Sequence, residues 1–231
     1  MTASIARGPC TTQLLEETIG ANLARTAARH PDREALVSVH QGLRYTYREL
    51  AAAVGEVARG LLALGVEQGD RVGIWSPNCA EWALVQYATA EIGAILVTVN
   101  PAYRVFELEY VLRQSGASVV VAAEAFLDGD YRAILTEVAP GLPLLRHVVY
   151  LDTPDWDGLA RGGATVDPAA VVARAAQLQP ADAINIQYTS GTTGFPKGAT
   201  LSHRNILNNG YFVGEACGYT SADRVCIPVP L

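Results

Sequence analysis

The chain has 231 residues, of which half are hydrophobic and 17% are charged, and its formal net charge is −6. This composition is typical of a globular protein with a buried sheet, and it excludes a disordered chain. Basic residues are scattered singly through an acidic sequence, which argues against a nucleic-acid-binding surface.

No stretch reaches the ~18 apolar residues that a membrane-spanning helix requires, and the N-terminus lacks the apolar region of a secretory signal. The four cysteines lie far apart, with no Cys-x-x-Cys pair. That spacing is typical of a reduced cytoplasmic protein and of incidental cysteines, not of a zinc site. We therefore predict a cytoplasmic location and no transmembrane segment, and we assign no residue as a metal ligand.

The first part of the chain alternates between helical and strand-like patterns. A Thr46–Glu49 capping box is predicted to open one helix, and glycine or proline follows several others. In chain order, the pattern predicts a helix over 12–29, a strand over 34–39, a helix over 46–64, a strand over 71–75, a helix over 76–92, a strand over 95–99, a helix over 104–114 and a strand over 119–122.

The second part continues the alternation. It predicts a helix over 130–138, a strand over 147–151, a surface connection over 152–163, a helix from 167 to about 178, a strand over 183–188, a polar glycine-rich loop and a helix over 203–217. This order predicts an α/β fold with a layered, parallel-rich sheet and flanking helices.

The loop after the predicted strand over 183–188 carries the clearest chemical signal. Its ten residues, Thr189 to Gly198, supply four hydroxyls, three glycines and one ammonium group. Lys197 is the only lysine among seventeen basic Lys and Arg residues. Glycine lets backbone N–H groups approach an anion, hydroxyls donate to phosphate oxygens, and a lysine supplies a compact positive charge. The loop is therefore predicted to bind a polyphosphate.

The loop differs from the two commonest phosphate-binding patterns. In a Walker A loop, Gly precedes the Lys and Ser or Thr follows it, whereas here Pro196 precedes Lys197 and Gly198 follows it. No Gly-x-Gly-x-x-Gly turn is present, so a dinucleotide fingerprint is absent from the sequence. The remaining alternative is a polar surface loop with an incidental lysine.

The segment Thr189–Lys197 resembles the signature of the adenylate-forming superfamily, which contains acyl-CoA synthetases, luciferases and peptide-synthetase adenylation domains. The flanking segments narrow the resemblance to medium-chain fatty acyl-CoA synthetases. These similar segments are 45–50, 69–72, 100–103, 107–110, 185–188 and 198–209.

The resemblance implies that a carboxylate attacks ATP to give an acyl-adenylate, and that coenzyme A then displaces AMP. It implies ATP, Mg²⁺ and coenzyme A as substrates or cofactors, and a fatty acid as the further partner. The residues matching the family's phosphate-binding positions are Thr189, Ser190, Thr192, Thr193 and Lys197, with room made by Gly191, Gly194 and Gly198. Lys197 is the candidate catalytic residue, and Phe195 and Pro196 are interpreted as stiffening the loop.

Family members are much longer and carry further motifs, so the chain is expected to be an N-terminal fragment that is inactive by itself. Residues 1–180 are expected to form the first α/β part of an AMP-binding domain, and residues 181–231 the start of the following part. Two alternatives stay open: another adenylate-forming enzyme, luciferase-like or of the peptide-synthetase type, and a nucleotide-binding module without catalysis. A homodimer is also left open.

His203 is interpreted as a helix-start histidine with a backbone partner, and Trp75 is interpreted as a core residue.

Overall fold

The computed structural model describes residues 12–189 and 195–231. Its centre is a six-stranded sheet in the order β10-β9-β4-β3-β5-β8. The strands are β3 (Arg71–Trp75), β4 (Ile95–Thr98), β5 (Val119–Ala122), β8 (His147–Tyr150), β9 (Ala183–Thr189) and β10 (Lys197–Ser202). All neighbouring pairs are parallel except the pair β9–β10, which is antiparallel. The predicted parallel-rich α/β fold is confirmed.

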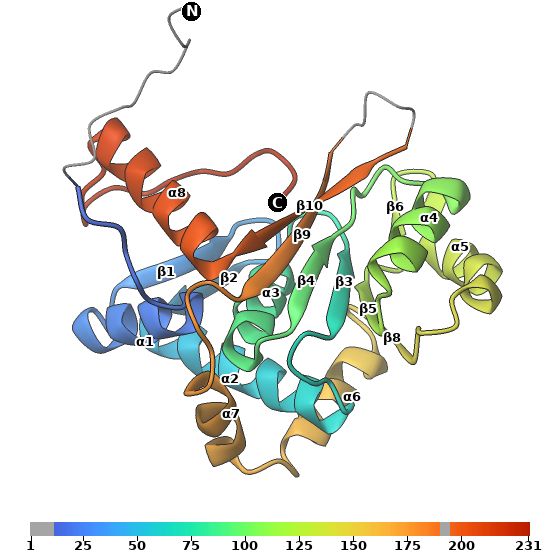
Figure 1. Ribbon diagram of the computed structural model, residues 1–231, viewed down its shortest axis with the longest axis horizontal. Helices are drawn as coiled ribbons and strands as arrows, with labels where there is room; N and C mark the ends of the chain where they lie inside the picture. The colour runs from blue at the N-terminus through green and yellow to red at the C-terminus, as the bar shows by residue number, and fades with distance from the viewer. Residues whose placement is uncertain (1–11, 190–194) are drawn as a thin grey trace, which may run out of the picture.

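Helices cover both faces of this sheet (Figure 1). One face carries α1 (Ile19–Arg29), α2 (Tyr47–Ala63), α3 (Ala80–Ile92), α6 (Pro154–Gly163) and α7 (Pro168–Ala175). The other face carries α4 (Val105–Ser115), α5 (Tyr131–Val138) and the 3₁₀ turn η1 (Ala139–Gly141). The last helix, α8 (His203–Cys217), follows β10, and its first turns pack against a small cluster that includes Ile19 at the start of α1.

Alternation along the central strands divides the buried residues between these two layers. In β3, Val72 and Ile74 belong to the core under α2 and α3, while Trp75 belongs to the core under α4 and α5. Trp75 is fully buried, and its ring stacks on Tyr131 of α5 with 3.5 Å between ring centroids. Successive side chains of a strand point to opposite faces, so a strand buried on both faces is apolar throughout.

Two small antiparallel pairs complete the described elements. They are β1 (Glu34–Ser38) with β2 (Leu43–Thr46), and β6 (Ala125–Phe126) with β7 (Gly129–Asp130). The capping box predicted at the start of α2 is present: Thr46 accepts from the Glu49 backbone, and the Glu49 side chain accepts from the Thr46 backbone.

The surface connection predicted over 152–163 is wrong, because most of it forms α6. Thr153 caps this helix, and Leu159 is buried against α2. A Cβ atom on Gly60 would lie 2.7 Å from Leu159, and one on Gly163 would lie 2.7 Å from the Gly60 backbone nitrogen. The glycines that indicated a loop instead allow two helices to approach closely.

The helix predicted over 12–29 begins only at Ile19, with Thr18 as its N-cap. The residues before it run along α8. There the Asn208 carboxamide accepts the Leu15 N–H at 2.8 Å and donates to the Leu15 carbonyl at 3.0 Å. One turn earlier on α8, two nitrogens of the Arg204 guanidinium donate to a single oxygen of the Glu16 carboxylate.

His203 joins this contact and confirms its interpretation as a helix-start histidine with a backbone partner. Its Nδ1 accepts the Ile19 N–H at 3.1 Å, and the side chain is 0% exposed. Burial lowers the pKa of His203 to about 4. The N-terminal segment is therefore attached to α8 by a neutral imidazole, a carboxamide and an ion pair. In the described ranges, no helix is long and apolar enough to cross a membrane.

Two buried titratable groups predict how stability depends on pH. Burial lowers the pKa of His203 to about 4, so stability from this residue is present above its unfolded pKa and is lost as pH falls. Burial raises the pKa of Glu91 to about 7, so stability from this residue is lost as pH rises through 7 and is regained on acidification. Between pH 7 and 5 the two effects are opposite, each on the order of 2 kcal/mol.

Glu91→Gln removes the titrating carboxyl group, and with it the gain in stability on acidification. Its free energy of unfolding, measured in urea, is expected to fall by about 2 kcal/mol more than that of the wild type between pH 7 and 5. His203→Gln is the mirror control, and its stability is expected to rise over the same interval relative to wild type. Parallel pH profiles for all three proteins would contradict this account.

Candidate functional site

The predicted phosphate-binding segment connects two strands of one hairpin. β9 leads into it and β10 leaves it, so the predicted strand–loop–helix order is wrong: a strand intervenes before α8. Lys197, the first residue of β10, is paired with Thr189, the last residue of β9. The two described ends of the connection, Thr189 and Lys197, are therefore held opposite each other by the ladder.

The position of this connection follows from the direction of β9. Because β9 is parallel to β4, its last residues leave the sheet at the carboxyl ends of β4, β3, β5 and β8. In open α/β sheets, ligands bind outside the carboxyl ends of the strands. Figure 1 shows the hairpin extending beyond this edge.

Three of the eight predicted binding residues lie in the described part of the chain: Thr189, Lys197 and Gly198. The other five lie outside the described residues, and they are Ser190, Gly191, Thr192, Thr193 and Gly194. The structure therefore brings together Thr189 and Lys197.

Lys197 is exposed at this edge. In the described parts of the chain, nine ion pairs form, and an arginine supplies the cation in each of them. Among those same residues, no carboxylate neutralises the Lys197 ammonium. An uncompensated cation beside hydroxyl and glycine residues fits a polyanionic ligand such as a nucleotide triphosphate.

Gly198 is explained at least as well by packing as by ligand contact. It is paired with Tyr188, and a Cβ atom on it would lie 3.0 Å from Ile186 and 3.3 Å from the Tyr188 ring. Ile186 and Tyr188 pack into the core under α4. The absence of a side chain at Gly198 therefore lets β10 lie flat against β9 and its aromatic neighbour.

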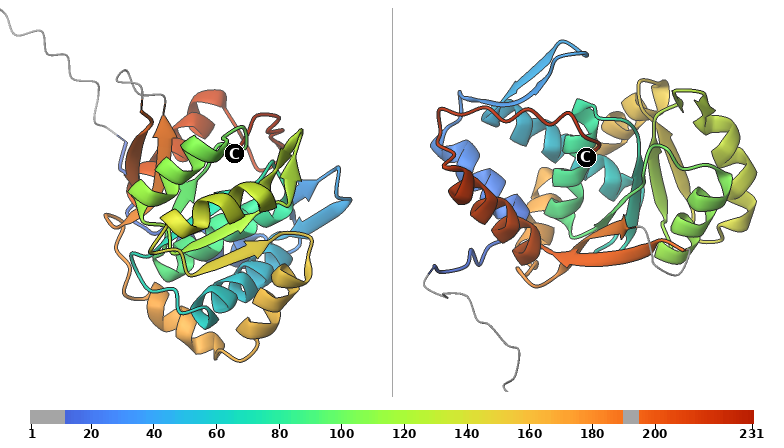
Figure 2. Two further views of the ribbon diagram at one scale, coloured as in Figure 1. Left: turned by 90° about the vertical axis from the view of Figure 1, so that its right-hand side faces the viewer. Right: turned by 90° about the horizontal axis from the view of Figure 1, so that it is seen from above.

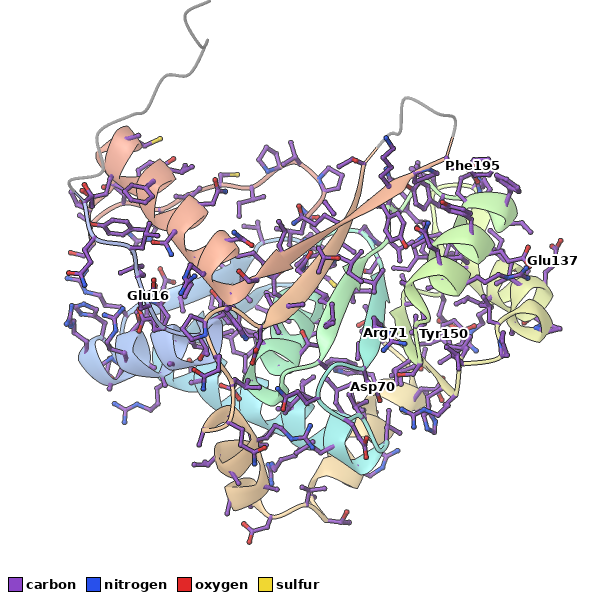
Figure 3. The ribbon with its side chains drawn as sticks, in the orientation of Figure 1. Glu16, Asp70, Arg71, Glu137, Tyr150 and Phe195 are labelled. Atoms are coloured by element: carbon purple, nitrogen blue, oxygen red, sulfur yellow. The ribbon has the colours of Figure 1, made fainter. Side chains whose placement is uncertain are left out.

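The connection also contacts α4, which sequence reasoning did not anticipate. Phe195, expected only to stiffen the loop, has its ring centroid 5.2 Å from that of Tyr110 and 6.1 Å from that of Phe106. Figure 3 shows Phe195 at the outer end of the hairpin, over α4. The i, i+4 spacing of Phe106 and Tyr110 on a predicted helix indicated that the two rings share a face of that helix. The spacing did not indicate which element that face contacts.

A cavity of about 380 Å³ lies between α4 and the hairpin. Its walls come from α4, β9, β10 and the residues before β10, namely Tyr110, Gln114, Ser115, Ile186, Tyr188, Phe195, Pro196, Lys197, Gly198 and Thr200.

The end of the described chain crosses the same carboxyl edge. At the turn after β3, the Asn78 carboxamide donates to the Val229 carbonyl at 2.7 Å and accepts the Leu231 N–H at 2.9 Å. Figure 2 shows this last segment running back from α8 over the sheet. The described ends of the hairpin, Thr189 and Lys197, and the final segment thus lie at the same edge of the sheet.

No group of three or more His, Cys, Asp or Glu residues that could hold a metal ion occurs within residues 12–189 and 195–231. The described donors at the hairpin are a hydroxyl and an ammonium, which suit phosphate oxygens and do not ligate Mg²⁺ as a carboxylate set would.

Together, the parallel sheet and the lysine-bearing connection at its carboxyl edge define an α/β protein of the nucleotide-binding class. Residues 23–231 match the family described as AMP-binding enzyme, and the chain belongs to that family.

Two curated relatives show how much of such a protein is present. YngI of Bacillus subtilis (strain 168) is 39% identical over an alignment of 237 positions, and the match covers 94% of this chain and 43% of that protein. The medium-chain acyl-CoA ligase ACSF2, mitochondrial, of Danio rerio is 40% identical over an alignment of 251 positions, and the match covers 100% of this chain and 41% of that protein. The chain spans about two fifths of the length of these relatives.

A solved structure agrees with this placement. The inhibitor-bound N-terminal domain of FACL13 from Mycobacterium tuberculosis superposes with a TM-score of 0.74 at 26% identity. The match covers 93% of this chain and 51% of that one.

The packing role of Gly198 can be tested against a matched glycine. In Gly198→Ala the new methyl group would press on Ile186 and Tyr188, so the melting temperature is expected to fall, by the equivalent of about 1 kcal/mol. Gly210→Ala, in α8, places its methyl group in open space and is expected to stabilise by about 0.5–1 kcal/mol. Equal stabilisation of both variants in thermal denaturation would refute the packing role.

Proposed function

We propose that the protein to which this chain belongs activates a fatty acid, of medium chain length, with ATP and transfers the acyl group to coenzyme A. The observation that carries the proposal is the single lysine, exposed and without a carboxylate partner in the described ranges, at the foot of a hydroxyl- and glycine-rich connection. Family membership and the name of the zebrafish relative support the same chemistry.

In the first step, a carboxylate oxygen of the acid forms a bond to the α-phosphorus of ATP, and the bond from that phosphorus to the β-phosphate oxygen breaks. Negative charge collects on the departing pyrophosphate. The ammonium of Lys197 and the hydroxyls of Thr189, Ser190, Thr192 and Thr193 are proposed to hold the β- and γ-phosphates and stabilise that charge. Mg²⁺, when bound with the nucleotide, would neutralise part of the phosphate charge.

In the second step, the thiolate of coenzyme A attacks the acyl carbon and AMP leaves. Nothing in the described residues is assigned to this step. We also propose that the chain divides near residue 180 into a first α/β part and the start of the following part. A cytoplasmic location is proposed as well, although the zebrafish relative is named as mitochondrial. A homodimer is a further proposal.

The alternatives differ in their products. A luciferase-like or peptide-synthetase enzyme would release pyrophosphate without making acyl-CoA, and a binding module would release neither pyrophosphate nor AMP. Assaying the full-length protein for pyrophosphate, AMP and acyl-CoA with acids of graded length distinguishes all three.

Lys197→Ala tests the candidate catalytic residue in that full-length protein. Loss of one preorganised charge donor is expected to slow pyrophosphate release about 10²- to 10³-fold, while the reaction of added acyl-AMP with coenzyme A changes much less. Arg29→Ala removes another exposed cation and serves as the control. Pyrophosphate release at the wild-type rate in Lys197→Ala would refute the assignment.

The 231-residue chain by itself is expected to make no acyl-CoA and to bind ATP weakly. Two apolar side chains in its last part are also open to water: Val213 is 50% exposed and Val229 is 62% exposed. Such surface favours self-association. An AMP-release assay and light scattering on one sample check both expectations, and turnover by a monodisperse monomer would contradict them.

A further inference from the structure

The residues just before Lys197 are attached to α4. The Tyr110 hydroxyl donates to the Pro196 carbonyl at 3.3 Å, and the Tyr110 ring packs against Phe195. Phe106, one turn earlier on α4, adds a second aromatic contact to Phe195. The backbone just before β10 is therefore held to α4 through the Phe195 ring and the Pro196 carbonyl, immediately upstream of Lys197.

The other strand of the hairpin is attached to the same helix. The Tyr188 hydroxyl donates to the Val111 carbonyl at 3.3 Å, and Tyr188 is paired with Gly198 across the ladder. Tyr188 of β9 and the two residues that precede β10 thus contact one helix, close to the points where the connection begins and ends.

Two further contacts keep this helix and its tyrosine in place. Gln114 donates to the Tyr110 oxygen at 2.8 Å, which leaves the tyrosine's own proton for the Pro196 carbonyl. At the C-terminal end of α4, the Arg71 guanidinium donates to the carbonyls of Ser115 and Gly116 at 2.8 and 3.0 Å. A cation on the last carbonyls of a helix is favourable. Figure 3 places Arg71 beside this end of α4.

We propose that Tyr110 is a positioning residue, which with Phe106 and Gln114 holds the Pro196 backbone so that Lys197 is presented at a constant place beside the phosphate-binding connection. This inference rests on the proposed function only for the identity of the group that Lys197 binds, a nucleotide phosphate. Tyr110 touches no reacting atom. Its effect is to hold the Pro196 backbone in place before an anion binds, so that Lys197 loses less conformational freedom on binding.

The contacts are few and partly open to water, since Phe106 is 63% exposed and Phe195 is 49% exposed. Segments with few buried apolar contacts open at low free energy. Loss of a single hydrogen bond should therefore shift the local opening equilibrium by a measurable factor.

The single lysine makes this opening measurable. A lysine-specific endoprotease can cut the 231-residue chain only after Lys197, so the cleavage rate reports the opening of the start of β10. Tyr110→Phe deletes the hydroxyl and keeps the ring, and it is expected to speed cleavage roughly two- to tenfold. Phe195→Ala is expected to speed cleavage as well.

Tyr131→Phe is the matched control. Its hydroxyl also donates to a proline carbonyl, that of Pro101 at 2.5 Å, but in the turn after β4 and away from the hairpin. It is expected to lower the melting temperature without speeding cleavage at Lys197. If Tyr131→Phe accelerates cleavage as much as Tyr110→Phe, the effect is global unfolding and the proposal fails. Wild-type cleavage rates in Tyr110→Phe and Phe195→Ala would overturn it equally.

Repeating the cleavage with MgATP in the full-length protein, where the product cut after Lys197 is identified by its mass, separates this inference from the proposed function. Nucleotide is expected to protect Lys197 in the wild type, and Tyr110→Phe is expected to need roughly two- to tenfold more ATP for half-protection. Absence of protection in the wild type at saturating MgATP would count against the phosphate-binding role of Lys197. The difference in cleavage without nucleotide would still decide the role of Tyr110.

Discussion

Parallel hydrogen bonding between β4 and β9, from Leu96–Asn185 to Thr98–Gln187, joins the last part of the chain to the sheet formed by the first. Because parallel strands point the same way, this pairing sends the β9–β10 connection to the edge where the other strands end. The turn after β3 and the final described segment lie at the same edge. An antiparallel β9 would have carried the same hydroxyls, glycines and lysine to the opposite edge.

The hairpin is held from two sides by contacts that are distant in sequence. On one side, α4 contacts β9 and the residues just before β10 through aromatic rings and tyrosine hydroxyls. On the other side, α8 follows β10 directly and is attached to the N-terminal segment by His203, Arg204 and Asn208. Each hydrogen bond contributes only about 1 kcal/mol, but the contacts lie on separate elements and restrain the hairpin jointly.

Sequence patterns predicted the elements that depend on interactions between residues close together in the chain. Apolar runs gave the central strands, and the Thr46–Glu49 capping box gave the start of α2. The sequence failed where a glycine or a polar strand takes its role from a distant partner: Gly163 allows α6 to approach Gly60, and β10 is a strand because β9 offers it a ladder. The same division holds at the site. The loop motif indicated Lys197, whereas the contact with Tyr110 exists only after α4 and the hairpin have packed.

Arginine supplies the cation in all nine described ion pairs. The side-chain amino group of Lys197 therefore takes part in none of them. A reagent that acylates amines would find one side chain, Lys197, besides the chain's own α-amino group. Guanidinium groups would keep their protons and their carboxylate partners throughout. A fluorophore or spin label attached through an amide bond at Lys197 would therefore sit beside the candidate site and leave all nine described ion pairs intact.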